Sequence, residues 1–234
     1  MITHVAFDAD DTLWHNETLF TLSQERFRAL LAAYADLATI DARLYEVETR
    51  NLSIFGYGIK GFTLSMIETA IELTEGRIDG HAIHTIIGYA REMVAAPIQL
   101  LDHAETVVRA LAERYQLLII TKGDLLDQES KIARSGLAEL FAGIEIVSNK
   151  DAATYRRVLA RHGITPASFV MVGNALRSDI LPVRAIGARA VHVPYVLTWA
   201  HEHADAEPAR DGYAQIADLS ELPKLLTRWQ EATL

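Results

Sequence analysis

Three carboxylates and a hydroxyl follow a short apolar segment near the start of this sequence of 234 residues. The apolar segment, residues 2–7, is predicted to be a strand, and residues 8–12 have the sequence Asp-Ala-Asp-Asp-Thr. Because alternate residues of an extended chain face the same way, Asp8 and Asp10 can converge on one point past the strand end. Two like charges that close cost free energy unless a metal ion or a proton lies between them. A polar turn with helix-capping residues would explain the same pattern.

Four further short apolar segments occur later in the chain, and predicted helices separate them. These segments are residues 117–120, 144–147, 169–172 and 190–193. Short, continuously apolar strands that alternate with helices are typical of a parallel sheet covered on both faces. We therefore expect an α/β fold with a doubly wound parallel sheet. In such folds, ligands bind at the carboxyl ends of the strands, near the point where the strand order reverses.

Polar residues follow several of these predicted strands. Thr121, Lys122 and Gly123 follow one strand, Lys150 comes shortly after the next, and Asn174 and Asp179 come after a third. Because the carboxyl ends of parallel strands share one edge of the sheet, these residues can share one site with Asp8 and Asp10.

A long segment between the first two predicted strands has only helical periodicity. We expect a core domain made of residues 1–16 and 97–234, with an inserted helical domain at residues 17–96. Within the insert, residues 56–61 contain three glycines and are predicted to form a mobile loop. Glycines let a backbone approach a ligand closely, so Tyr57 and Lys60 of this loop are candidate substrate contacts.

The composition excludes several classes of protein. A net charge of -9 and a pI of about 5.5 argue against a nucleic-acid or membrane partner, because an acidic surface repels both. The chain has no cysteine, and its nine histidines show no repeated ligand spacing, so we assign no zinc site. No membrane span or export signal is predicted, which indicates a cytoplasmic protein. Residues 199–203 are interpreted as a surface or packing feature.

In order, spacing and context, the polar motifs resemble those of the haloacid dehalogenase superfamily. Residues 8–12 match motif one, Thr121 motif two, Lys150 motif three, and residues 173–179 motif four. The resemblance covers the whole chain, and it implies a Rossmann-like core with a helical cap of the C1 type. One position departs from the pattern, because Asn174 stands where this family often has an aspartate.

The resemblance implies a magnesium-dependent phosphatase that acts on a small phosphorylated metabolite. Asp8 would attack phosphorus and form an aspartyl phosphate, and Asp10 would protonate the leaving alcohol and then activate water. Thr121, with the backbone N–H groups of Lys122 and Gly123, would bind phosphate oxygens.

Positive charge would come from two sources in this scheme. Lys150 would neutralise charge on the nucleophile and the phosphoryl group. Mg²⁺ would be held by Asp8, the backbone carbonyl of Asp10 and Asp179, with Asn174 beside it. The protein would be a monomer or a homodimer.

Several other interpretations remain open. A 2-haloacid dehalogenase shares the nucleophile, but the relatives with that activity lack an acid at the position of Asp10. A phosphonate hydrolase or a sugar-phosphate mutase shares the core residues. A receiver-type phosphoacceptor module also combines acids, a hydroxyl and a lysine. Structural roles are the other alternative: Lys150 could be a surface lysine paired with Asp151, and Asp151 is expected to cap the helix that follows.

Overall fold

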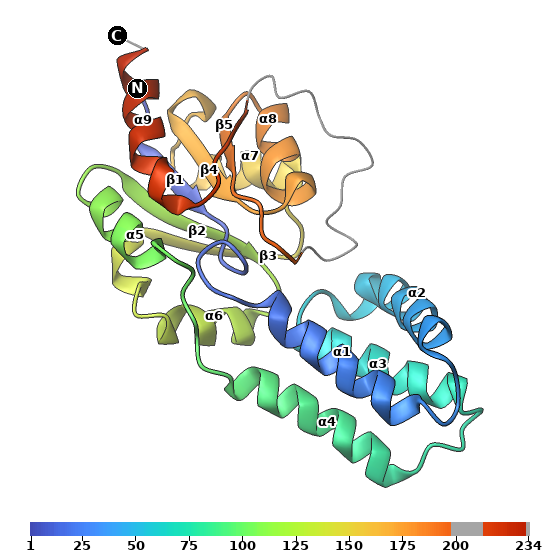
Figure 1. Cartoon of the computed structure of the whole chain (residues 1–234). Helices are drawn as coiled ribbons and strands as arrows, with labels where there is room; N and C mark the ends of the chain where they lie inside the picture. The colour runs from blue at the N-terminus through green and yellow to red at the C-terminus, as the bar shows by residue number, and fades with distance from the viewer. Residues whose placement is uncertain (198–212, 233–234) are drawn as a thin grey trace. The chain divides into compact units, whose positions relative to one another are not determined.

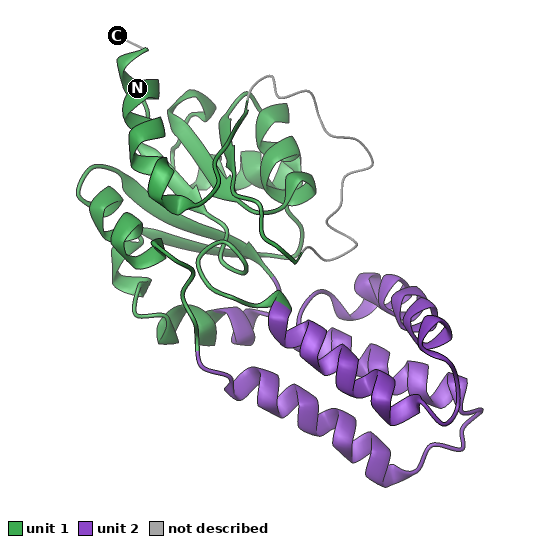
Figure 2. Ribbon diagram, in the orientation of Figure 1, with its two compact units in different colours: residues 1–17, 98–122, 129–234 green, residues 18–97, 123–128 purple. Residues whose placement is uncertain are grey.

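The computed structural model describes residues 1–197 and 213–232 of the chain. The chain divides into two compact units (Figure 2): a core unit of residues 1–17, 98–122 and 129–234, and a helical unit of residues 18–97 and 123–128. The expected insert, residues 17–96, lies almost entirely in the helical unit, which also contains the short segment that follows the second strand. Residues 199–203 lie outside the described part of the chain.

The described residues of the core unit form a six-stranded parallel sheet (Figure 1) with the strand order β3-β2-β1-β4-β5-β6. The strands are β1 (His4–Phe7), β2 (Gln116–Lys122), β3 (Gly143–Val147), β4 (Phe169–Gly173), β5 (Arg189–His192) and β6 (Tyr213–Gln215). Strand β1 lies between β2 and β4, so the order reverses beside it. This arrangement confirms the doubly wound sheet, and it places the reversal point where the acidic motif leaves β1.

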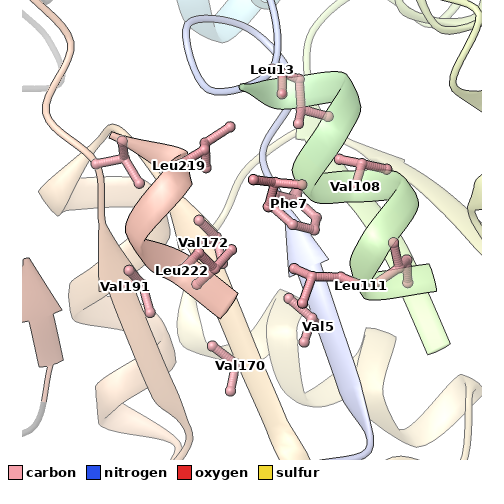
Figure 3. Packing of buried hydrophobic residues seen from close by; sticks show 14 of the residues in the cluster. Val5, Phe7, Leu13, Val108, Leu111, Val170, Val172, Val191, Leu219 and Leu222 are labelled. Atoms are coloured by element: carbon pink, nitrogen blue, oxygen red, sulfur yellow. The ribbon is translucent and has the colours of Figure 1, made fainter. Parts of the chain in front are cut away.

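Helices cover both faces of the sheet. Successive side chains of β1 point to opposite faces, so neighbouring residues of this strand pack in different clusters. Val5 and Phe7 belong to one buried cluster, whereas Ala6 belongs to the other. The first cluster includes residues of α5 (Ala104–Ala112) and α9 (Leu222–Glu231), and part of it is shown in Figure 3. The second includes residues of α7 (Ala152–Arg161) and α8 (Leu181–Ala185).

The remaining helical elements connect the strands or build the helical unit. They are α1 (Glu17–Leu31), α2 (Leu37–Phe55), α3 (Ile59–Leu73), α4 (Gly80–Ala95), α6 (Leu125–Arg134), the short helices Ala138–Leu140, Pro166–Ser168 and Leu219–Glu221, and a π-helical turn, η3 (Leu176–Ile180). No helix among the described residues is both long and apolar enough to cross a membrane.

Helix α3 corrects the prediction of a loop at residues 56–61. The helix begins at Ile59, so Lys60 and Gly61 are helical and only residues 56–58 connect α2 to α3. A Cβ atom on Gly61 would lie 2.7 Å from the carbonyl oxygen of Gly56. This glycine therefore serves a close contact between the connection and the helix, and not the mobility that its spacing suggested.

The helical unit has its own apolar core. Two of its helices start at aspartates that cap them: Asp36, the N-cap of α2, accepts a hydrogen bond from the Thr39 N–H at 2.8 Å, and Asp79, the N-cap of α4, accepts one from the Ala82 N–H at 2.7 Å. The fully buried residues of this core are Phe27, Leu31, Ile40, Leu44, Met66, Ala70 and Ile86. Because these residues form a separate cluster, the helical unit is stabilised by its own packing.

Replacing Leu44 by alanine is expected to destabilise this unit by about 2–5 kcal/mol, since it removes a fully buried side chain and leaves a cavity. The matched control is Tyr45→Ala, because Tyr45 is the next residue of α2 and is 47% exposed; we expect a change within about 0.5 kcal/mol. Chemical denaturation followed by circular dichroism measures both values. Equal losses for the two variants would contradict the assigned core.

Candidate active site

One buried ammonium group joins two carboxylates at the carboxyl edge of the sheet. Asp8 directly follows β1, and its N–H donates to the Val172 carbonyl at 2.9 Å. Lys150 donates from Nζ to Asp8 Oδ1 and, at 2.7 Å, to Asp179 Oδ1. Lys150 is only 3% exposed, so the interpretation of it as a surface lysine is wrong. Asp151 instead caps α7 by accepting from the Thr154 N–H at 2.7 Å, as expected.

Burial and charge oppose each other in this cluster. Burial raises the pKa of Asp8 to about 6 although the Lys150 ammonium acts in the opposite direction. For Lys150, burial alone would lower the pKa, but the carboxylates of Asp179 and Asp8 outweigh it and raise the pKa. With both acids ionised, the cluster holds two negative charges and one positive charge, so it retains an excess of negative charge.

A tight turn places Asp179 in the cluster. Asp179 lies in the π-helical turn after β4, and its Oδ2 accepts from the Ala175 N–H at 3.1 Å. A Cβ atom on Gly173 would lie 2.3 Å from that same oxygen. Glycine at the end of β4 therefore allows the carboxylate to pack against the strand end, and π-helical turns occur frequently at functional sites.

The Thr12 hydroxyl links Asp8 to Asn174. Thr12 Oγ1 lies 3.3 Å from both Asp8 Oδ2 and Asn174 Oδ1, and it accepts from the Asn174 N–H at 3.1 Å. A hydroxyl has one proton, so it donates to one of these two oxygens at a time. On the other side, His192 Nε2 lies 3.0 Å from the Asn174 carbonyl oxygen. Asn174 is therefore held directly beside the nucleophile candidate.

Asp10 is held by different partners. Lys131, on α6, donates from Nζ to both Asp10 carboxylate oxygens at 2.8 Å and to Asn16 Oδ1 at 3.2 Å. Trp14 Nε1 donates to Asp10 Oδ1 at 2.8 Å. Asp8 and Asp10 therefore do not share one cationic partner, because each has its own lysine.

Asp11 stabilises the turn that follows β1. It adopts a positive φ of 61° and accepts hydrogen bonds from the Asn16 N–H at 2.9 Å and the Glu17 N–H at 3.1 Å. Burial raises its pKa to about 7, although these backbone donors favour the carboxylate. Asp11 thus has a structural role at the start of α1, where a carboxylate is favourable.

The residues that follow β2 show a mixed picture. Thr121 is buried at the strand end, and within the described residues its hydroxyl makes no hydrogen bond to the Asp8 cluster. Burial lowers the pKa of Lys122 to about 8, and the Lys150 cation adds to that shift. Gly123 has a φ of 146°, and a Cβ atom there would lie 2.7 Å from Gln128 Nε2, so the position favours glycine.

The two substrate candidates of the helical unit differ in their surroundings. Tyr57 is half-buried in the connection between α2 and α3. Lys60 donates to both carboxylate oxygens of Asp124, at 3.0 and 3.1 Å, although its side chain is 63% exposed. Lys60 is thus ion-paired within the helical unit, and not a lysine contacted only by solvent.

The donor set at this site suits a hard divalent cation. Asp8 and Asp179 could supply carboxylates, Asn174 and the Asp10 backbone could supply neutral oxygens, and oxygen ligands are what Mg²⁺ prefers. Among the described residues, no three Asp, Glu or His side chains are arranged together as metal ligands. The Asp10 side chain is engaged by Lys131 and Trp14, so only its carbonyl would be used. The residues therefore fit a site with two carboxylate ligands and an excess of negative charge.

Sequence reasoning assigned no site role to Thr12, Trp14, Asn16, Lys131 or His192. One signal pointed to Lys131: Gln128 and Lys131 are three residues apart on one helix, and such residues share a face. Both are buried, at 2% and 7% exposure. Two long polar residues on one face of the helix after motif two predict a polar contact there, but they do not identify Asp10 as the partner.

Comparisons with known proteins agree with this fold. A haloacid dehalogenase-like family hydrolase from Xanthomonas campestris is 43% identical, over 97% of this chain and 91% of that one, with a TM-score of 0.87. A 2-haloacid dehalogenase from Pseudomonas syringae is 25% identical, over 98% and 100% of the two chains, with a TM-score of 0.65.

A curated relative is the glyceraldehyde 3-phosphate phosphatase of Pyrococcus furiosus, which is 28% identical over 148 residues. That match covers 61% of this chain and only 56% of the relative. The family model described as a haloacid dehalogenase-like hydrolase matches residues 2–187. The chain therefore belongs to the haloacid dehalogenase-like hydrolase family.

Proposed function

We propose that this hydrolase is a magnesium-dependent phosphatase of small phosphorylated metabolites. The proposal rests on one observation: Asp8 and Asp10 are held by different partners. Asp8 is ion-paired with Lys150, whereas Asp10, two residues later, is held by Lys131 and Trp14. A phosphate ester needs both a nucleophile and a proton donor for its leaving alcohol, and these two acids supply one each.

In the first half-reaction, an Asp8 oxygen attacks phosphorus, the bond from phosphorus to the ester oxygen breaks, and an aspartyl phosphate forms. Asp10 gives its proton to the departing oxygen, so an alcohol leaves and Asp10 becomes a carboxylate. In the second half-reaction, Asp10 removes a proton from water, which attacks phosphorus and releases phosphate together with the Asp8 carboxylate.

Fixed charges would support both half-reactions. Lys150, held by Asp8 and Asp179, supplies positive charge next to the nucleophile. Mg²⁺, when bound by Asp8, Asp179 and the Asp10 carbonyl, would neutralise charge on the phosphoryl oxygens. Thr121 and the backbone N–H groups of residues 122 and 123 are the proposed donors to phosphate. We assign the helical unit the role of a cap domain that contributes to substrate selection.

A 2-haloacid dehalogenase is the second candidate, because a protein with that activity is 25% identical over nearly the whole chain. In that reaction the nucleophile attacks carbon and a halide leaves. A halide departs as an anion and needs no proton, so the first half-reaction of a dehalogenase gives an acid beside the nucleophile no task. The contacts of Asp10 with Lys131 and Trp14 therefore favour the phosphatase.

The discriminating experiment is a substrate panel. It contains phosphorylated metabolites, among them glyceraldehyde 3-phosphate, together with 2-chloropropionate, each assayed with Mg²⁺ and with a chelator. Release of phosphate that requires Mg²⁺ supports the proposal, whereas release of chloride that does not require it would establish the dehalogenase.

Replacing Asp8 by asparagine is expected to abolish phosphate release, because the amide removes the nucleophile and a metal ligand. Steady-state assays with an aryl phosphate measure the loss, and circular dichroism checks the fold. The control Glu113→Gln neutralises an exposed carboxylate in the same way and should retain activity. An active Asp8→Asn variant would exclude the covalent route.

Replacing Asn174 by aspartate is expected to tighten Mg²⁺ binding by roughly tenfold or more, since a unit charge about 4 Å away is worth about 1–4 kcal/mol. Titration calorimetry with Mg²⁺ alone measures this. The control Gln116→Glu adds the same charge at the amino end of β2, away from the site. Unchanged affinity in Asn174→Asp would place the metal elsewhere.

Lys60→Ala is expected to lower kcat/KM for the preferred metabolite of the panel much more than for phenyl phosphate, if Lys60 helps to select the leaving group. Asp124→Asn is the matched variant, because it removes the charge that pairs with Lys60 and can still cap α6 through Asp127 N–H. Equal losses on both substrates in both variants would mean that the ion pair matters only for the fold of the helical unit.

A further inference from the structure

We propose that Lys131 is a positioning residue, which holds the Asp10 carboxyl group in the orientation from which it gives a proton to the leaving alcohol. This inference rests on the proposed phosphatase activity and adds to it a residue outside the motifs that carry the family resemblance. Lys131 acts through Asp10 and does not itself touch the reacting atoms.

Three hydrogen bonds fix the Asp10 carboxylate. The Lys131 ammonium donates to both carboxylate oxygens at 2.8 Å, so it is equidistant from the two oxygens. This pair of contacts restrains rotation of the carboxylate. The Trp14 indole donates to Oδ1 at 2.8 Å from one side. A carboxylate held by donors from two directions has less freedom to rotate than one held by a single donor, and general acid catalysis depends on the placement of the proton.

The two donors are themselves held in place. Trp14 is fully buried, and its backbone pairs with both Asp10 and Leu100. The Lys131 side chain is 8% exposed and makes a further hydrogen bond to Asn16 at 3.2 Å. Removing a long cationic side chain from water costs free energy that one ion pair does not always recover, so a buried lysine is weak evidence for stability. Because Lys131 is ion-paired with Asp10, the proposed proton donor, we infer that it has a role beyond stability.

A purely structural role makes a different prediction from a positioning role. If Lys131 only attached α6 to the turn after β1, its loss would lower stability and would affect all phosphate esters equally. If it positions Asp10, its loss would matter most where the leaving group needs a proton. An alkoxide leaves poorly without one, whereas para-nitrophenolate is a stable anion and leaves without assistance.

The test is a single-turnover measurement of leaving-group release, which isolates the first half-reaction. Lys131→Met is compared with the parent protein on glycerol phosphate and on para-nitrophenyl phosphate. We expect a loss of about 10- to 100-fold on the alkyl ester and less than about threefold on the aryl ester, because misplacing the acid forfeits part of a ~10²–10⁴-fold effect. Arg134→Met is the control, since it removes an exposed cation from the same helix.

A double-mutant cycle shows whether Lys131 acts through Asp10. Once Asp10→Asn has removed the acid, adding Lys131→Met should cause no further loss on the alkyl ester. Thermal unfolding is measured in parallel. If Lys131→Met does not fold, Lys131→Gln, which keeps a neutral donor, is used in the same comparison.

The outcomes separate this inference from the proposed function. A selective loss on the alkyl ester that disappears in the Asp10→Asn background establishes the positioning role. An equal loss on both esters, no loss on either, or a full further loss in that background overturns it and leaves the phosphatase assignment standing. A parent protein that hydrolyses no phosphate ester overturns both.

Discussion

The ion pairs of Lys150 with Asp8 and Asp179 are the constraint on which the site depends. These three residues follow β3, β1 and β4, so the bonds require the carboxyl ends of three strands to lie at one level. The parallel register supplies that level, since Phe7 pairs with Val172 of β4 and with Ile119 of β2, and Ile119 pairs in turn with Ile144 of β3. If Lys150 were lost, two carboxylates would remain buried without a cation to compensate them, which is strongly destabilising. The fold and the site are thus held by the same contacts.

The three carboxylates of motif one have separate tasks, although the sequence presents them as equivalent. Asp8 is paired with Lys150, Asp10 is held by Lys131, and Asp11 accepts backbone N–H groups at the start of α1. Which task each acid performs depends on the direction of its side chain after the strand ends. Asp11 itself has a positive φ of 61°, which no periodicity predicts.

The sheet could be predicted because β1, β2 and β4 contain runs of apolar residues bounded by polar turns, whereas β5 has only Ala190 and Val191 between Arg189 and His192. Strand β6 has only three residues, none of them buried, so it carries no such signal. The spacing of residues 178–186 predicts one helix, whereas the structure has the π-helical turn η3 followed by α8; π and α turns have similar side-chain patterns. Within the site, Lys150 and Asp179 could be identified from motif spacing. The partners Lys131 and His192 could not, because they lie outside the motifs that carry the family resemblance.

Separate lysines also reduce the electrostatic coupling between two carboxyl groups that lie only two residues apart in the chain. A single cation shared by both carboxylates would couple them, so that neutralising one acid would change the charge felt by the other. Lys150 comes from the segment after β3, whereas Lys131 comes from α6, so the two cations reach the motif from different elements. Each acid can then have its own environment while the chain keeps them adjacent. Under the proposed function, such different environments would allow one carboxyl group to attack and the other to transfer a proton.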